Sequence, residues 1–152
     1  KVAIDKGIET IIDFFGVRLA KELVAKNIKA DLLLGNNVLA HVPDIVDFVK
    51  GMKIVLNDRG IITMEFPHLM QLVDHSQFDT IYHEHFSYLS FHTTKKIFEA
   101  CGLELFDVEE IPTHGGSLRI FAKHVEDISK EISPCVEALV QKEFRNGMNS
   151  LA

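Results

Sequence analysis

Apolar and polar residues in the first half of the chain follow a pattern that predicts strands and helices in alternation. Residues 8–12, 31–37 and 60–66 are rich in β-branched or aliphatic side chains and have the length of strands. Apolar residues at helical spacing lie between them, in residues 17–26 and in a segment that starts at Pro43. Strands that alternate with helices form parallel sheets, in which the strands are buried.

The helices of the first half are expected to bury one face each. Residues 1–6 are predicted to form a short helix that ends at Gly7, because glycine is favoured at helix C-termini, and we expect more chain before Lys1. The residues expected to face the core in the next two helices are Val17, Ala20, Leu23, Val24, Ile45, Val46, Val49 and Met52.

The second half of the chain has a different pattern. A helix capped by Thr93 or Thr94 is predicted to end before Gly102. Two strands are predicted at residues 103–111 and 117–123, and the turn-forming residues between them favour an antiparallel hairpin.

The last predicted element is a helix from about residue 126, interrupted at Ser133 and Pro134, within which the chain stops. The whole pattern predicts an α/β fold with a doubly wound, mostly parallel sheet. This chain would form the second half of a seven-stranded sheet, ending in an antiparallel pair, and the first half would precede it.

Composition and charge restrict the function classes. The chain has 152 residues, 47% of them hydrophobic and 25% charged, which is typical of one globular domain. The formal net charge is -6 and the basic residues are scattered, so we do not expect a nucleic-acid partner. The two cysteines, Cys101 and Cys135, form no Cys-x-x-Cys pair, which favours a reducing cytoplasm. Since no apolar run approaches the roughly 20 residues that cross a bilayer, no membrane partner is expected.

A first candidate site follows the strand predicted at residues 31–37. Asn36, Asn37 and His41 lie just beyond its carboxyl end, where doubly wound sheets bind ligands. An alternative is that the two asparagines form a turn and that His41 caps the next helix.

The strongest local signal is the sequence Tyr82, His83, Glu84, His85. A phenol, a carboxylate and two imidazoles in four residues are typical of proton transfer near neutral pH. Histidines on an exposed strand, or a metal site with a third ligand elsewhere, are the alternatives. In a regular strand Tyr82 and Glu84 would face away from His85, so a shared pocket requires a loop here.

Two further segments carry weaker signals. Asp13 can accept a hydrogen bond from an adenine amino group and Phe14 can stack on the ring, although a turn and ordinary core packing explain them too. His114 and Arg119 flank a Gly-Gly pair, an arrangement that suits contact with a phosphate or a sugar hydroxyl. A hairpin turn explains the glycines equally well.

Residues 35–42, 82–88 and 113–119, in this order and spacing, resemble the nucleotide-sugar C-methyltransferases of deoxysugar pathways. The resemblance extends from about residue 1 to at least Phe144. It implies the class I fold of S-adenosylmethionine (SAM)-dependent methyltransferases. Members of that family also have an N-terminal zinc-binding domain, so zinc is expected only in such a domain and not in this chain.

The resemblance also implies a division of the chain and a reaction. Residues 1–124 would belong to the methyltransferase domain, and residues 125–152 would form a helical segment leading toward a C-terminal domain. A base would remove a proton next to the ketone of a nucleotide-linked keto-deoxysugar, and the enolate would then attack the methyl group of SAM.

By motif position His85 would be that base, with Tyr82 as the other candidate. Tyr82 should hydrogen-bond near the ketone oxygen, Glu84 should orient the sugar or the imidazole, and His41 should lie across the pocket. The residues expected to bind the cofactor are Asn36, Asn37, Asp13 and Phe14, and those expected to bind the substrate are His114 and Arg119.

Two other functions fit the same residues. The chain could bind a nucleotide sugar or serve as an assembly surface without catalysing methylation. Alternatively, His41, His83 and His85 could form the facial metal site of an oxygenase or hydrolase, although the doubly wound pattern argues against that class.

Overall fold

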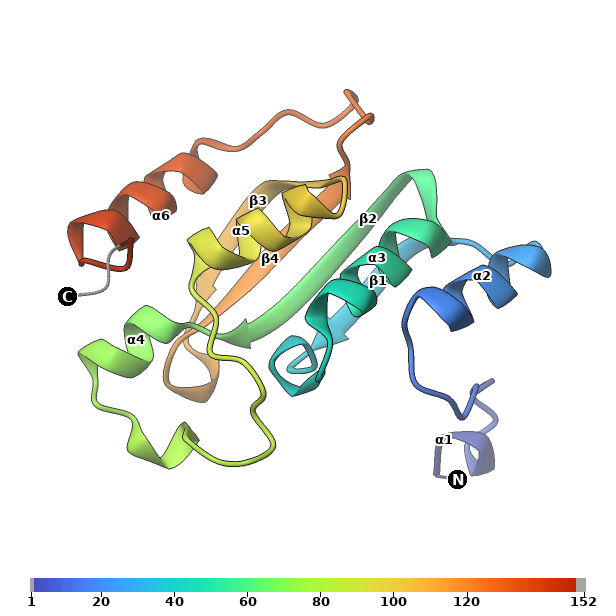
Figure 1. The fold of residues 1–152 in the computed structure, drawn as a ribbon, viewed down its shortest axis with the longest axis horizontal. Helices are drawn as coiled ribbons and strands as arrows, with labels where there is room; N and C mark the ends of the chain where they lie inside the picture. Colours follow the sequence, from blue (N-terminus) through green and yellow to red (C-terminus); the bar gives the residue numbers. More distant parts are fainter. Residues whose placement is uncertain (1, 150–152) are drawn as a thin grey trace.

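A computed structural model describes residues 2–149 and contains a mixed four-stranded sheet (Figure 1). The strands are β1 (Ala30–Asn36), β2 (Leu56–Pro67), β3 (Leu103–Ile111) and β4 (Ser117–His124), and their order in the sheet is β1-β2-β4-β3. The first pair is parallel, and β4 runs antiparallel to both β2 and β3. The predicted α/β class and the closing antiparallel pair are therefore confirmed.

Six α-helices and three short 3-10 helices precede, connect or follow the strands within the described residues. The α-helices are α1 (Val2–Asp5), α2 (Val17–Ala25), α3 (Ile45–Val55), α4 (Leu69–Asp74), α5 (Phe91–Ala100) and α6 (Pro134–Arg145). The 3-10 helices are η1 (Leu39–His41), η2 (Phe78–Thr80) and η3 (Thr113–Gly115). In residues 2–149 no helix combines the length and apolar character needed to cross a membrane.

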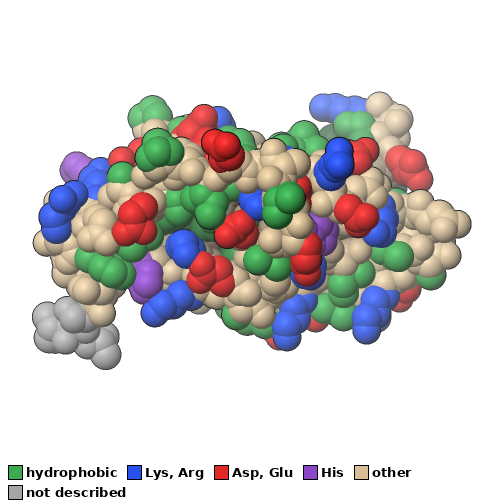
Figure 2. Space-filling view, turned by 90° about the horizontal axis from the view of Figure 1, so that it is seen from above, with side chains coloured by type: hydrophobic (Ala, Val, Ile, Leu, Met, Phe, Trp, Pro, Cys, Tyr) green, Lys and Arg blue, Asp and Glu red, His purple; other side chains and the backbone are tan. Residues whose placement is uncertain are grey.

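The hydrophobic core lies between one face of the sheet and helices α3 and α5, which cover that face (Figure 1). Large buried side chains of this core include Phe48, Met52, Ile62, Met64, Phe66, Phe91, Phe98, Leu118 and Ile120. Helix α2 packs beside α3, and α6 packs on β3 and α5. Acidic and basic side chains are interspersed on the face drawn in Figure 2, as their scatter along the sequence predicts.

Strand β1 is less buried than predicted. Leu33 packs toward the core, but Leu32 and Leu34 on the opposite face are 53% and 70% exposed. Helices of the described chain cover one face of the sheet at this edge, so alternate side chains of β1 remain in contact with solvent.

The strand predicted at residues 8–12 is absent from the described structure. These residues form no regular element, and Ile8 and Ile12 are 58% and 82% exposed. A β-branched run becomes a strand only where a neighbouring strand accepts its hydrogen bonds, and β1 pairs only with β2 in the described sheet. The predicted end of the preceding helix is confirmed, because Gly7 has φ +74° and Ile8 N donates to Ala3 O. Lys1 lies outside the described residues.

Two helices begin at residues other than those predicted. Helix α3 starts after Asp44, whose side chain accepts a hydrogen bond from Asp47 N, rather than at Pro43. Ser90, not a threonine, caps α5 by accepting from the backbone amide of Thr93 at 3.1 Å. The core face of α3 also differs from the prediction, since Val46 is 41% exposed.

The prediction that Ser133 and Pro134 interrupt the last helix is wrong. Ser133 caps the helix by accepting from Cys135 N, and Pro134 occupies the first turn, where a missing N–H costs nothing. The helix is thus initiated, not interrupted, at this position. It ends at Arg145, since Gly147 has φ +78° and Met148 N donates to Glu143 O, so the expectation that the chain stops within this helix is wrong.

Candidate active site

The structure brings His41 together with the segment that contains Tyr82 and His85. His41 ends the 3-10 helix that follows β1, and the second segment is a loop between η2 and α5. Backbone amides of Phe86 and Ser87 donate to Ala40 O at 2.9 and 3.2 Å and hold the two together. The loop required for Tyr82 and His85 to share one pocket is therefore present.

His85 is oriented by a hydrogen bond on each ring nitrogen. Its Nδ1 lies 2.9 Å from Thr80 O, and because a carbonyl can only accept, Nδ1 carries the proton. In the neutral ring the lone pair is then on Nε2, which lies 3.1 Å from the hydroxyl of Tyr82 and can accept from it. The Tyr82 ring packs on His85 with centroids 4.3 Å apart. This geometry points Nε2 of His85 at a phenol and Nδ1 at a backbone carbonyl.

His41 has the same tautomer by the same argument. Its Nδ1 lies 2.9 Å from Glu84 O, so this nitrogen is the donor, and in the neutral ring Nε2 carries the lone pair. The rings of His41 and His85 are 4.7 Å apart, and Tyr88 meets His85 edge-on at 5.8 Å. We call His41, Tyr82, His85 and Tyr88 the loop cluster.

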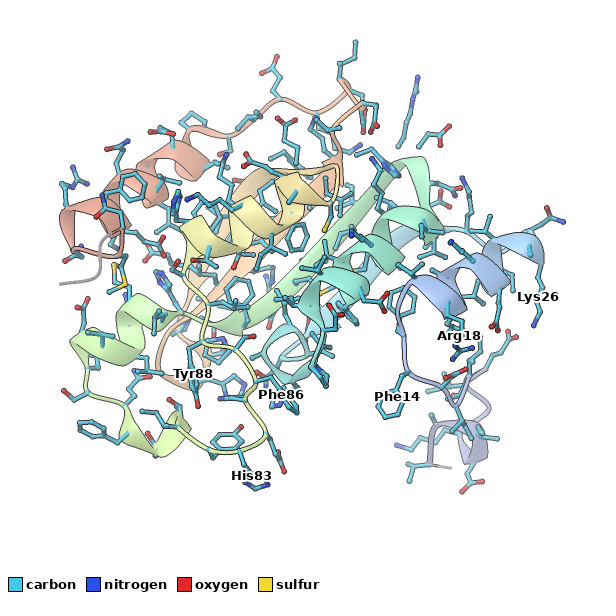
Figure 3. All side chains as sticks on the ribbon, in the orientation of Figure 1. Phe14, Arg18, Lys26, His83, Phe86 and Tyr88 are labelled. Atoms are coloured by element: carbon cyan, nitrogen blue, oxygen red, sulfur yellow. The ribbon has the colours of Figure 1, made fainter. Side chains whose placement is uncertain are left out.

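The other two residues of the motif take different positions. The carboxylate of Glu84 is exposed, and it is the backbone carbonyl of this residue that contacts His41. His83 lies at the outer end of the loop, pointing away from the protein (Figure 3). No three His, Cys, Asp or Glu side chains within residues 2–149 are grouped so that they could hold a metal ion. The facial metal site is thus not formed by the part of the chain described here.

Three of the four residues predicted to bind the cofactor, Asn36, Asp13 and Phe14, line two adjoining hollows. One, of about 430 Å³, is lined by Asn36 among apolar residues, and the other, of about 570 Å³, contains Asp13, Phe14 and His41. The two share Phe15, Val38 and Phe48. His41 of the loop cluster therefore faces the same hollow as Asp13 and Phe14.

Asn37 lies beside these hollows in an unusual environment. Its φ of +53° is a left-handed conformation that asparagine tolerates. Its backbone N–H donates a hydrogen bond to the backbone carbonyl of Glu65 at 2.9 Å. Among the described residues its side-chain Oδ1 is buried and has no hydrogen-bond partner. A buried acceptor of this kind is stabilised when a donor reaches it.

Asp13 and Phe14 are both at the surface. Arg18 lies 2.6 Å from Asp13 Oδ1, and this hydrogen bond lowers the pKa of the Asp13 carboxyl, which therefore stays ionised. Phe14 is 93% exposed and projects from the segment before α2 (Figure 3). Phe15 was not among the residues predicted to bind the cofactor, yet its ring packs edge-on against Phe48 at 5.5 Å and lines both hollows. Its position next to Phe14 was the only signal in the sequence.

His114 and Arg119 are placed differently from the loop cluster. His114 is exposed in the turn between β3 and β4 and has φ +52°. Arg119 lies between two carboxylates, with Nε 2.7 Å from Glu65 and Nη1 3.0 Å from Glu109, and the hydrogen bond to Glu65 is the main reason that its pKa is raised. Through these contacts Arg119 of β4 joins side chains of the two neighbouring strands, β2 and β3. A contact of His114 or Arg119 with substrate stays a prediction.

Comparisons with known proteins show what the whole chain is similar to. A family model described as the C-methyltransferase C-terminal domain matches residues 112–152. The chain is 36% identical over 147 residues to C-methyltransferase NovU of Streptomyces niveus, a match that covers 97% of this chain and 35% of NovU. The chain thus spans about a third of the length of that relative.

A solved structure gives a similarity of fold. It is a complex between the Trm112 methyltransferase activator of Haloferax volcanii and a protein described as a methyltransferase. The TM-score is 0.54 at 12% identity, and the match covers 64% of this chain and 55% of the other. The arrangement of helices and strands is therefore one that methyltransferases also have.

Proposed function

Because the chain belongs to the C-methyltransferase family, we propose that it forms the catalytic part of a SAM-dependent enzyme that methylates a carbon atom of a nucleotide-linked keto sugar. The observation that carries this proposal is the loop cluster, in which the carbonyl of Thr80 holds Nδ1 of His85 and Nε2 faces the hydroxyl of Tyr82. It lies against His41, which lines the hollow predicted for the cofactor.

The residues around that hollow fit SAM. Phe14 is an exposed ring on which an adenine can stack, and ionised Asp13 can accept a hydrogen bond from the adenine amino group. The unpartnered Oδ1 of Asn37 can accept from the ammonium group of the methionine part. When bound, SAM supplies the electrophilic methyl group.

His85 acts as the base in the proposed reaction. Its Nε2 accepts the proton from the carbon next to the ketone, and the electrons of that C–H bond become the enolate. The imidazolium that forms is stabilised by the carbonyl of Thr80, which accepts from Nδ1. The hydroxyl of Tyr82 turns from Nε2 to the enolate oxygen and donates to it. The enolate carbon would then take the methyl group of bound SAM as the bond between that methyl and sulfur breaks, which would restore the ketone and leave the demethylated cofactor as a neutral thioether.

The remaining expectations belong to the same proposal. Residues 1–124 form the methyltransferase part and residues 125–152 lead toward a C-terminal domain, the acceptor is a small nucleotide sugar, and the enzyme works in the cytoplasm. The packing of Val136, Leu139 and Val140 in the core supports a C-terminal segment that is fixed to the methyltransferase part.

Exchange of the proton next to the ketone tests the base. The natural full-length protein, with demethylated cofactor bound, is incubated in deuterated water with a nucleotide 4-keto-sugar. Substituting His85→Ala should slow deuterium incorporation by about 10²- to 10⁴-fold, the usual contribution of a general base. His83→Ala, on the outer side of the same loop, is the matched control and should exchange at the wild-type rate.

The outcomes separate the competing functions. Undiminished exchange in the His85 variant would move the base to Tyr82 or elsewhere. If the wild-type protein binds the sugar but catalyses no exchange, the chain is a binding or assembly module and the proposed function fails.

A further inference from the structure

Glu143 of α6 is a fully buried carboxylate that the proposed reaction does not use. Its side chain and that of His68 are both 0% exposed, and His68 Nε2 lies 2.7 Å from Glu143 Oε1. The backbone amides of Phe91 and His92 donate to its two oxygens at 2.6 and 2.8 Å. Three donors from two distant parts of the sequence thus converge on one carboxylate.

These donors mark the two ends of the segment that carries the loop cluster. His68 immediately follows β2, and Phe91 is the first residue of α5. Residues 69–90 lie between them and include α4, η2 and the loop with Tyr82 and His85. In Figure 1 this segment extends from the end of β2, while α6 lies beside α5. Glu143 therefore joins both ends of the segment to a helix outside it.

The main chain closes the segment at the same place. Leu69 N donates to Leu89 O at 3.0 Å, and His68 forms a β-bridge with Leu89. Only 22 residues separate His68 from Phe91, so a shift of either end moves the anchor points of the loop cluster. Thr80 O, which orients His85, belongs to this segment.

The surroundings of Glu143 stabilise an ionised carboxylate at this position. Burial would raise the pKa of Glu143, but the hydrogen bonds from His68 and from the amides of His92 and Phe91 outweigh it, and the pKa is lowered. The amides also form the N-terminus of α5, whose dipole favours an anion. Within residues 2–149, His68 Nδ1 is buried without a partner, so the carboxylate holds the imidazole in the Nε2–H tautomer.

We propose that Glu143 is a positioning residue that fixes His85 and Tyr82 in their working geometry by holding both ends of residues 69–90. The effect on catalysis rests on the proposed function, whereas the effect on the geometry of His85 does not. Because Glu143 lies in the region that matches the C-methyltransferase C-terminal domain, this contact links that region to the loop cluster.

The test uses matched substitutions in the natural full-length protein. Glu143→Gln keeps the size of the side chain but turns an amide group toward N–H donors, whereas Glu137→Gln makes the same change at an exposed position of α6. His68→Gln keeps an N–H donor for Glu143, and His68→Leu removes it. The second pair decides the outcome if Glu143→Gln does not fold.

The tautomer of His85 is the first measurement. Nitrogen NMR of labelled histidine, assigned by the signal that His85→Gln removes, should show the Nδ1–H form in the wild type, in Glu137→Gln and in His68→Gln. Glu143→Gln and His68→Leu should show a mixture of tautomers. A residue that only stabilises the fold would lower the melting temperature and leave the tautomer unchanged, and this result would overturn the proposal.

Proton exchange at the sugar is the second measurement. We expect the two disruptive variants to lose at least tenfold in rate with little change in KM. A mixture of tautomers together with wild-type exchange would support the positioning role and refute His85 as the base. A wild-type tautomer together with slow exchange would refute the positioning role and leave the proposed function standing.

Discussion

The chain has two histidine-containing groups that differ in burial and in how their protons are fixed. In the loop cluster, His41 and His85 are partly exposed, and each donates from Nδ1 to a backbone carbonyl. In the interior, His68 is 0% exposed and contacts a side-chain carboxylate, that of Glu143. The main chain thus orients two imidazoles that are open to solvent, whereas the buried pair has no access to solvent and acts through the structure around it.

The largest difference should be in stability. Glu143→Gln leaves buried amides facing an amide group and should lower the free energy of unfolding by about 2–3 kcal/mol, a typical cost of unsatisfied buried polar groups. Glu84→Gln, the same change in the exposed loop, should stay within about 0.5 kcal/mol of the wild type. Chemical denaturation of the three proteins measures both values. Equal losses of stability in Glu143→Gln and Glu84→Gln would show that the buried carboxylate contributes no more to folding than the exposed one.

Lowering the pH should reduce the contribution of Glu143 to the free energy of unfolding. The pKa of Glu143 is lowered in the folded protein, so its contribution to stability is present above the unfolded pKa, about 4.3 for glutamate, and decreases as the pH falls toward the folded value. The difference in unfolding free energy between the wild type and Glu143→Gln should therefore be constant from pH 7 to pH 5.5 and shrink below pH 4.5. A difference that grows on acidification would contradict an ionised Glu143.

Much of the fold could be predicted because its signals are local. Residues 17–26, 103–111 and 117–123 carry periodic patterns and were placed within one or two residues of the observed bounds. Residues 8–12 have equally good β-branched composition, but a strand depends on a partner that composition does not reveal. Pro134 was misinterpreted because a proline in the first turn and a proline that breaks a helix look alike in sequence.

The candidate site could be predicted only where side chains carry the signal. Tyr82 and His85 were identified from the density of titratable groups, whereas the contact that sets the tautomer of His85 comes from a backbone carbonyl, which every residue has. The contact of Glu143 with His68 spans 75 residues. Such a pair forms only when distant segments pack together, so the local periodicity of the sequence does not predict it.

Within the loop cluster, Tyr82→Phe should affect chemistry more than stability. It removes the hydroxyl 3.1 Å from His85 Nε2 and keeps the ring contact. Losing one donor to the enolate should reduce the rate of proton exchange by about 10²- to 10³-fold, with the melting temperature nearly unchanged. Tyr88→Phe, which keeps the edge-on ring contact with His85, is the control. If both variants exchange at the wild-type rate, Tyr82 does not donate to the reacting oxygen.

The smallest effect is expected at the rim of the cofactor hollow. Phe14→Ala removes a ring that is 93% exposed, so it costs little in folding and should change only the binding of an adenine that stacks on it. Stacking beyond simple burial contributes about 0.5–1.5 kcal/mol, which corresponds to a roughly two- to tenfold rise in the Kd of SAM measured by calorimetry. Phe78→Ala, at another exposed phenylalanine that does not line the hollow, should leave this Kd unchanged. Equal Kd values for both variants and the wild type would move the adenine away from Phe14, while the loop cluster would keep its proposed role, because its geometry does not depend on this ring.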